Sequence, residues 1–301
     1  MDVDSVVVIT YPGHFYITLL SLRSVVRHQQ WTGPIHVVYD DCSELAWPDY
    51  AQCFAQAAGR VIPNPINMIP FSSVAGIEKF HDGWYRQQIA KLFLDTVLPD
   101  RSWFLLDGDV VLETAISTDA VPITILCDSQ KSEECLMDIH FTNYVKHMLG
   151  QGPGQLWDGQ ERLITSGVPY RFLDSNLLPN LRQHCEQQIA CDFIDYHIQQ
   201  AAAGHFIRYS EDRNKMAMTE WELIECYRAH VLGEPLNWVA VDPDANYEYL
   251  VATANKQQPQ LLNHIQVGLA WCNDAELGQQ WFENQQIEIN EEIWQKIYQK
   301  H

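Results

Sequence analysis

The first sixty residues alternate between short apolar runs and segments with helical spacing. Apolar runs at 6–10 and 35–39 predict two strands, and a brief third one is expected at 61–62. Between the first two, residues 16–28 carry apolar side chains three and four positions apart, which is typical of a helix, and a second helix is expected over 48–58. This β-α-β-α-β order predicts an α/β fold, with a mostly parallel sheet flanked by helices.

An uninterrupted run of four apolar residues further along the chain leads directly into two aspartates. Residues 103–106 are Trp-Phe-Leu-Leu, and Asp107-Gly108-Asp109 follows directly. Such a run predicts a strand buried on both faces, so the two carboxylates are expected at its carboxyl end, where open α/β sheets bind ligands. Two carboxylates one residue apart can share a hard divalent cation, and Gly108 is expected to leave room for phosphate oxygens. A strand-ending turn has the same residue types, so this motif alone leaves both interpretations open.

The remaining pattern adds one helix before that strand and several elements after it. Residues 83–94 are expected to form the helix that precedes the strand, while 63–82 lack periodicity and are expected to form a long loop, a possible lid. Thr219 and Glu222 fit a capping box at the start of another helix. Further elements are expected at 121–126, 136–149, 168–173, 177–186, 189–203 and 238–242.

The charge balance bears on the partners. The chain has 19 Lys and Arg residues and 39 Asp and Glu residues. The resulting net charge of −20 repels nucleic acid and anionic membranes. The eight cysteines form no C-x-x-C pair, so reduced thiols are expected. Neither a basic-then-apolar leader nor an apolar stretch of about 18 residues is evident. These features predict a cytoplasmic protein with no nucleic-acid partner and no membrane span; the oligomeric state is not indicated.

Four segments together resemble a known family. They are Thr10-Tyr11 after the first strand, residues 83–92 (Gly-Trp-Tyr-Arg-Gln-Gln-Ile-Ala-Lys-Leu), Asp107-Gly108-Asp109, and 219–223 (Thr-Glu-Trp-Glu-Leu). In this order, over about residues 5 to 240, the chain resembles nucleotide-sugar-dependent glycosyltransferases of the GT-A type. More narrowly, it resembles the DxD-containing glycosyltransferase-like group of bacteria and algal giant viruses. The resemblance implies a GT-A (Rossmann-like) fold, with a mixed, mostly parallel sheet flanked by helices in a single catalytic domain.

The resemblance assigns the two aspartates to a metal and a diphosphate. Asp107 and Asp109 are implied to hold Mn²⁺ or Mg²⁺, with Asp109 as the direct ligand and Asp107 closer to the ribose or sugar. His264 is the best candidate for a further ligand, although it is equally compatible with a packing role. A cation at this place would stabilise the diphosphate that leaves when the sugar is transferred.

Other donor contacts are implied nearby. Tyr11 is placed to stack on the nucleotide base, and Arg86, Gln87 and Lys91 are placed to reach the diphosphate or ribose. Ordinary packing of Tyr11 and a solvated helix face for the other three remain the alternatives.

The acceptor side needs a base if the reaction inverts configuration. Glu220 is the first candidate, since it matches the family's Ser/Thr-Glu position; complementing the helix dipole is its alternative role. Asp174, Asp192 and Asp195 are further candidates, and 174–176 and Trp221 are candidate acceptor contacts. A retaining reaction would need no such base.

The sequence therefore predicts a metal-dependent glycosyltransferase that uses a nucleoside diphosphate sugar, with a UDP-sugar favoured, and a glycan or other hydroxyl acceptor. Residues 1–267 are expected to form the catalytic domain, with a donor half at 1–126 and an acceptor half at 127–267, followed by a helical extension at 268–301. Two alternatives stay open: a sugar-nucleotidyltransferase, which would normally carry a basic Gly-rich loop after the first strand, and a non-catalytic nucleotide-sugar-binding module. A dehydrogenase is disfavoured because no G-x-G-x-x-G follows that strand.

Overall fold

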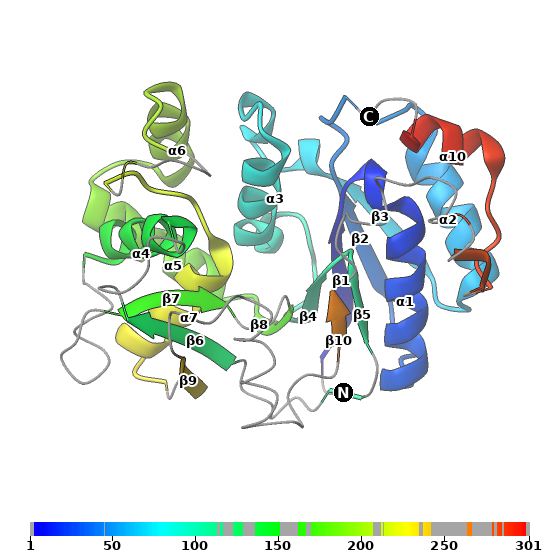
Figure 1. Cartoon of the computed structure of the whole chain (residues 1–301), viewed down its shortest axis with the longest axis horizontal. Coiled ribbons are helices and arrows are strands. Elements are labelled where there is room, and N and C mark those ends of the chain that lie inside the picture. Colours follow the sequence, from blue (N-terminus) through cyan, green and yellow to red (C-terminus); the bar gives the residue numbers. More distant parts are fainter. Residues whose placement is uncertain are drawn as a thin grey trace.

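The computed structural model covers most of the chain (Figure 1). It describes residues 3–44, 46–112, 115–116, 123–128, 136–150, 162–166, 170–206, 212, 214–234, 237–241, 264–266, 279, 282–284 and 286–298.

A five-stranded sheet forms the centre of the molecule. Its strands are β1 (Ser5–Thr10), β2 (Ile35–Tyr39), β3 (Ile66–Pro70), β4 (Ser102–Asp107) and β8 (Tyr170–Asp174), in the order β3-β2-β1-β4-β8. The first four of these strands run parallel, and β8 is antiparallel to β4. The predicted α/β fold, with a mixed, mostly parallel sheet flanked by helices, is confirmed.

Helices cover both faces of this sheet, as the continuous apolar strands require. α1 (Phe15–Gln29) and α2 (Tyr50–Val61) cover one face, and α3 (Gly83–Leu92) covers the other (Figure 1). Successive residues of β4 alternate between these faces: Phe104 and Leu106 belong to the core on the α1 side, and Trp103 and Leu105 to the core on the α3 side. All four are fully buried.

The second half of the chain builds a helical layer and a smaller sheet. The helices α4 (Leu136–Leu149), α5 (Leu177–Ile189) and α7 (Glu220–His230) contribute to the core on the α3 side, and α6 (Phe193–Ala202) joins them. The smaller sheet has the order β7-β6-β9, from β6 (Ile123–Asp128), β7 (Arg162–Ser166) and β9 (Asn237–Val241). The sequence pattern predicted strands near β6 and β9, at 121–126 and 238–242, but it predicted neither β7 nor a separate sheet.

Two predictions about residues 61–82 were wrong. Residues 61–62 end α2 and its C-cap, and the third strand is β3, at Ile66–Pro70. The segment taken for a structureless loop contains β3 and two 3₁₀ turns, Phe71–Ser73 and Ile77–Lys79. Its apolar side chains enter the core irregularly, with Phe71, Val74, Ile77 and Phe80 all buried, and this spacing has no single period.

A short antiparallel pair joins distant parts of the chain beyond β4. β5 (Val110–Leu112) pairs with β10 (His264–Gln266), so the strand after Asp109 lies beside the strand that begins at His264. Nearer the C-terminus, Phe282 and Trp294 pack on Tyr16 of α1, and α10 (Glu291–Tyr298) lies on the α1 side of the sheet (Figure 1).

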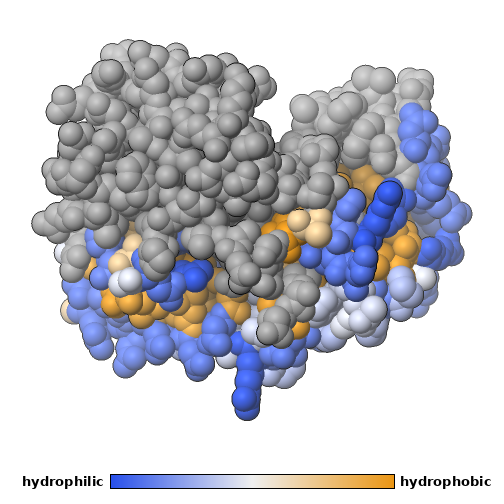
Figure 2. All heavy atoms as spheres, turned by 90° about the horizontal axis from the view of Figure 1, so that it is seen from below, coloured by the Kyte–Doolittle hydropathy of each residue, from blue (hydrophilic) through white to orange (hydrophobic). Residues whose placement is uncertain are grey.

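The described surface is mainly hydrophilic at its edge. Figure 2 shows hydrophilic residues along the outer rim of the face seen from below, with hydrophobic residues further in. Among the described residues, no helix has the length and apolar character needed to cross a membrane.

Candidate functional site at the carboxyl edge of the sheet

Asp107 lies at the point where the strand order of the sheet reverses. The chain builds outward from β1 to β3 and then returns to place β4 on the other side of β1. Asp107, the last residue of β4, is paired in register with Ile9 of β1. Open α/β sheets bind ligands in the crevice at such a switch point, outside the carboxyl ends of the strands.

The alternation along β4 decides what Asp107 meets. Trp103 and Leu105 face α3, so Asp107 is expected on the same face. There, the Lys91 ammonium of α3 lies 2.5 Å from Oδ1 of Asp107 and also pairs with Glu220, the first residue of α7. The Lys91 and Glu220 side chains are each 2% exposed and that of Asp107 13%, so this is a buried cluster of two carboxylates and one ammonium.

Two further donors hold Asp107. The Gln87 amide donates to Oδ1 of Asp107 at 3.4 Å, and the Trp221 side chain, which can only donate, hydrogen-bonds the same carboxylate. The Trp221 ring also lies under the Lys91 ammonium, 4.5 Å from the ring centroid. Two predicted donor-site residues, Gln87 and Lys91, are thus brought to Asp107, and the predicted acceptor-side residue Glu220 lies in the same cluster.

Burial and ion pairing have opposite effects on the pKa values of Asp107, Glu220 and Lys91. Burial raises the pKa of Asp107; Lys91 opposes this effect, and the nearby Asp109 adds to it. Burial likewise raises the pKa of Glu220 to about 7, again against the opposing effect of Lys91. For Lys91, burial favours the neutral form, but the two carboxylates outweigh burial and raise its pKa. The ammonium therefore stays charged, and the two carboxyl groups share it.

Gly108 has a different role from the one expected. A Cβ at Gly108 would lie 2.8 Å from Thr10 Cβ, Thr10 Oγ1 and Thr18 Oγ1, so β1 and α1 already occupy that space. The Gly108 amide also donates to the Ile9 carbonyl at 2.7 Å. The expectation that its missing side chain leaves room for phosphate oxygens was wrong: the glycine lets the Asp107–Asp109 turn approach β1.

Asp109 is the last residue of this turn. It is half-buried, directly before β5. The β5–β10 register sets Gln266 opposite Val110 and His264 opposite Leu112, so the backbone of the predicted ligand His264 lies two residues farther from Asp109 than Gln266 does. The side chain of His264 is outside the described residues, and its role as a ligand stays a prediction.

The donor set suits a hard cation that arrives with phosphate. Mg²⁺ is commonly held by one or two carboxylates together with substrate phosphates and water, and Asp109 with Asp107 supplies such carboxylates. Among the described residues, no group of three or more His, Cys, Asp or Glu side chains is arranged to hold an ion. The repulsion from Asp109 that raises the pKa of Asp107 is the interaction that a bound cation would relieve.

Tyr11 and His14 form the β1 side of the same edge. Tyr11 is half-buried directly after β1, and its ring lies 4.0 Å from that of His14, centroid to centroid. His14 is buried, and burial lowers its pKa to about 4, partly opposed by Asp107. A neutral histidine and an aromatic ring thus stand across the switch point from Asp107.

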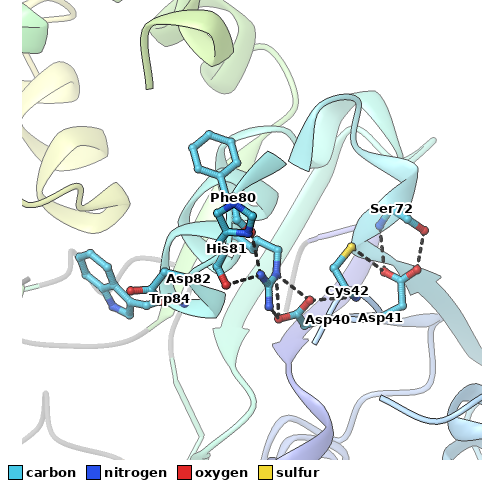
Figure 3. A network of polar contacts seen from close by, with 9 residues as sticks. Asp40, Asp41, Cys42, Ser72, Phe80, His81, Asp82 and Trp84 are labelled. Carbon is cyan, nitrogen blue, oxygen red and sulfur yellow. Dashed lines mark hydrogen bonds and ion pairs between the residues drawn. The ribbon is translucent and has the colours of Figure 1, made fainter. Parts of the chain in front are cut away.

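Arg86 forms an ion pair and hydrogen bonds with other protein groups, which the sequence did not predict. Its guanidinium donates to both carboxylate oxygens of Asp40, at 2.8 to 3.1 Å, and to the carbonyls of Phe80 and His81 at 2.7 and 2.8 Å. Figure 3 shows this network at the end of β2, with Asp41 bound to Ser72 beside it. The guanidinium is occupied by protein acceptors, so this geometry offers no support for its predicted contact with the diphosphate or ribose.

Two of the alternative acceptor-side carboxylates, those of Asp174 and Asp192, have local partners. Asp174 is paired in register with Ser102, at the opposite end of β4 from Asp107, and its carboxylate accepts from the Asn176 backbone at 2.8 Å. Asp192 caps α6 by accepting from the Asp195 amide at 3.0 Å. Residues 174–176 therefore lie away from the Asp107 cluster, at the other edge of the sheet.

The sequence interpretation missed how α7 and β2 contribute. The Gln88 side-chain carbonyl accepts from the Glu220 backbone N–H at 3.1 Å, and Asp40 closes the Arg86 network. The available signal was the position of Gln88 and Lys91 one turn apart on α3, where both are buried together with Ile89 and Leu92. Polar residues on a buried helix face require partners, but their identity depends on tertiary structure.

Together, these observations define an α/β protein with an acidic, cation-paired site at the switch point of its main sheet. The comparisons with known proteins add little to this description. No protein-family model and no curated protein matches the chain. Among solved structures, the chain is similar to the apo structure of the WbbM bifunctional glycosyltransferase, with a TM-score of 0.38 and 11% sequence identity. That match covers 66% of this chain and 37% of the other.

Proposed function

We propose that this protein is a metal-dependent glycosyltransferase that takes a sugar from a nucleoside diphosphate sugar, with a UDP-sugar as donor and a glycan or another hydroxyl compound as acceptor. The proposal is based on the position of three residues at the switch point. Asp107 and Asp109 lie at the end of β4, and Tyr11 lies at the end of the neighbouring strand β1. That crevice accepts a nucleotide in other open α/β sheets, with carboxylates positioned for a metal-bound diphosphate.

Each of the three residues would have its own role in donor binding. Asp109 would hold Mn²⁺ or Mg²⁺, Asp107 would contact the ribose or sugar and share the metal, and Tyr11 would stack on the base. When bound, the cation would act as a Lewis acid for the leaving diphosphate. Asp107 and Asp109 place two carboxyl groups at the sheet edge, so a divalent cation would offset their repulsion of a diphosphate.

The base for the acceptor hydroxyl is not assigned by this geometry. Glu220 has a pKa of about 7, raised by burial, which suits a base near neutral pH. Its carboxylate is 2% exposed and paired with Lys91, so an acceptor hydroxyl could reach it only if that ion pair opened. The base role of Glu220 stays a prediction.

A thermal-shift panel of nucleotides and nucleotide sugars, each with and without Mn²⁺, tests the proposal. A ligand at a hundred times its Kd stabilises the folded state by about 2.7 kcal/mol, so UDP and one UDP-sugar should raise the melting temperature in the presence of Mn²⁺. Release of UDP from that sugar nucleotide would support glycosyl transfer. Release of pyrophosphate from a nucleoside triphosphate would instead favour the sugar-nucleotidyltransferase, and no shift with any nucleotide would refute the proposal.

A further inference from the structure

We propose that Lys91 and Trp221 are positioning residues: they hold the Asp107 carboxylate in one orientation at the sheet edge, and neither contacts the donor. The inference deepens the proposed function and rests on it for its binding measurement. It replaces a direct contact between Lys91 and the diphosphate with an indirect role through Asp107.

The Lys91 ammonium is enclosed by protein groups. Its side chain is 2% exposed, and its nitrogen is paired with Asp107 on one side and Glu220 on another. The Trp221 ring covers a further side at 4.5 Å. An ammonium has three N–H donors, and these three neighbours occupy its surroundings, so little of it is left to meet a phosphate.

The first turn of α7 is fixed by the same face of α3. Gln88 and Lys91 are one turn apart on that helix; Gln88 accepts from the Glu220 backbone, and Lys91 pairs with the Glu220 side chain. The backbone bond satisfies one of the amides that a helix start leaves without an intrahelical partner. Because Glu220 is held at both its backbone and its side chain, the next residue, Trp221, is placed to donate to Asp107.

The consequence falls on Asp107. Its Oδ1 accepts from Lys91 and Gln87, both on α3, while Trp221 reaches the carboxylate from α7. A side chain held by three donors from two helices does not have to be ordered when a ligand binds, which removes part of the cost of binding. The helix α7, which carries the acceptor-side candidate Glu220, thereby contributes to donor binding through Asp107.

The variant Trp221→Phe tests the indole while keeping the ring beneath Lys91. Calorimetric titration with UDP and Mn²⁺ should show about tenfold weaker binding than wild type, the scale expected for one hydrogen bond to a charged group. Trp31→Phe is the matched control, since it removes an indole that donates to the Pro34 carbonyl at 3.1 Å outside the site, and its affinity should equal that of wild type. Equal affinity of wild type and Trp221→Phe would overturn the inference for Trp221.

Lys91→Arg separates positioning from direct contact. Arginine keeps the charge and binds phosphate at least as well as lysine, but its planar guanidinium does not fit the space of the ammonium. Positioning through Asp107 predicts at least tenfold weaker binding of UDP and Mn²⁺. An affinity equal to or higher than that of wild type would show a direct phosphate contact and overturn the inference for Lys91.

A ligand-free cycle keeps this test separate from the proposed function. In the absence of nucleotide, Asp107→Asn and Trp221→Phe should be coupled, with the double variant differing at least threefold in its unfolding equilibrium constant from the value expected by adding the single effects. Additive effects would contradict the inference even if UDP binds. Coupling without any UDP binding to wild type would support the positioning of Asp107 by Trp221 and refute the proposed function instead.

Discussion

Gly108 shows how a single position shapes the candidate site. The close approach of Thr10 and Thr18 leaves no space for a side chain between Asp107 and Asp109, so the two carboxylates are held against the end of β1. The sequence identified this glycine but assigned its open space to the ligand. The packing partner comes from α1, ninety residues earlier, and no local pattern reveals it.

Replacing Gly108 by alanine should therefore overpack the turn. We expect Gly108→Ala to lower the free energy of unfolding by about 1–3 kcal/mol in urea denaturation. Gly59→Ala is the matched control: its Cβ would meet nothing within 4 Å in α2, and alanine should raise the free energy of unfolding by about 0.5–1 kcal/mol. Similar effects of the two substitutions would show that the turn has room for a side chain.

Glu220 is the residue for which two roles make different predictions. As a buried partner of Lys91, it is expected to affect the fold, so Glu220→Gln should change the melting temperature together with any transfer activity. As a general base alone, the same variant would lose transfer about 100-fold or more while keeping its melting temperature and donor affinity. We expect the first outcome, and the second would establish the base role.

At the scale of elements, the helix α3 organises the site. Asp82 caps α3 by accepting from the Trp84 amide at 2.8 Å, and Arg86 ties the first turn of α3 to Asp40 at the end of β2. The sequence suggested residues 63–82 as a lid. The part at 71–82 is held through the Phe80 and His81 carbonyls and through Ser72. Its placement at the sheet edge thus depends on polar contacts, of which the Arg86–Phe80 hydrogen bond is buried.

The Arg86–Asp40 pair should consequently be costly to break. Arg86→Met leaves the Asp40 carboxylate buried without its partner, and we expect a loss of about 3–5 kcal/mol in the free energy of unfolding. Arg60→Met removes the exposed pair with Glu288, whose side chains are 71% and 79% exposed, and should change the same quantity by less than about 1 kcal/mol. Denaturant unfolding of the two variants side by side measures the contrast; equal losses would mean that Arg86 does not anchor this segment.

At the scale of the whole molecule, the sequence predicted the elements better than their assembly. Strand β2 and helix α4 have the predicted bounds, because regular apolar periods or uninterrupted apolar runs define them. The separate β7-β6-β9 sheet and the pairing of β8 with β4 were not predicted, since strand pairing depends on contacts between distant segments. The sequence located the candidate site through Asp107 and Asp109. The contact of Trp221, on α7, with Asp107 depends on the tertiary structure.

The stability of the whole molecule should depend on a histidine in its second half. His197 donates from Nδ1 to the Phe193 carbonyl at 2.5 Å and accepts at Nε2 from the Tyr144 hydroxyl at 2.8 Å, and burial lowers its pKa to about 4 from 6.5. Between pH 6.5 and 4, the unfolded chain binds a proton at this residue that the folded chain does not, so the contribution of His197 to stability is lost as the pH falls.

Unfolding measurements over this pH range test the histidine. As the pH falls from 6.5 to 4, the free energy of unfolding of wild type should decrease more steeply than that of His197→Gln, by about 1.4 kcal/mol per pH unit. The two curves should run parallel above pH 7, where His197 is neutral in both states. Parallel curves through the acid range would show that the imidazole is not buried in its neutral form.

The central claim is that Asp109 and Asp107 bind a metal-complexed diphosphate at the switch point. Calorimetric titration of UDP into wild type, Asp109→Asn and Asp192→Asn, each with and without Mn²⁺, tests this most directly. Asp192→Asn removes the same charge from the cap of α6, where asparagine caps equally well, and so controls for net charge. We predict that Mn²⁺ strengthens UDP binding at least tenfold in wild type and Asp192→Asn and has no such effect in Asp109→Asn. Equal Mn²⁺ dependence in all three proteins, or no binding of UDP to wild type, would contradict the account.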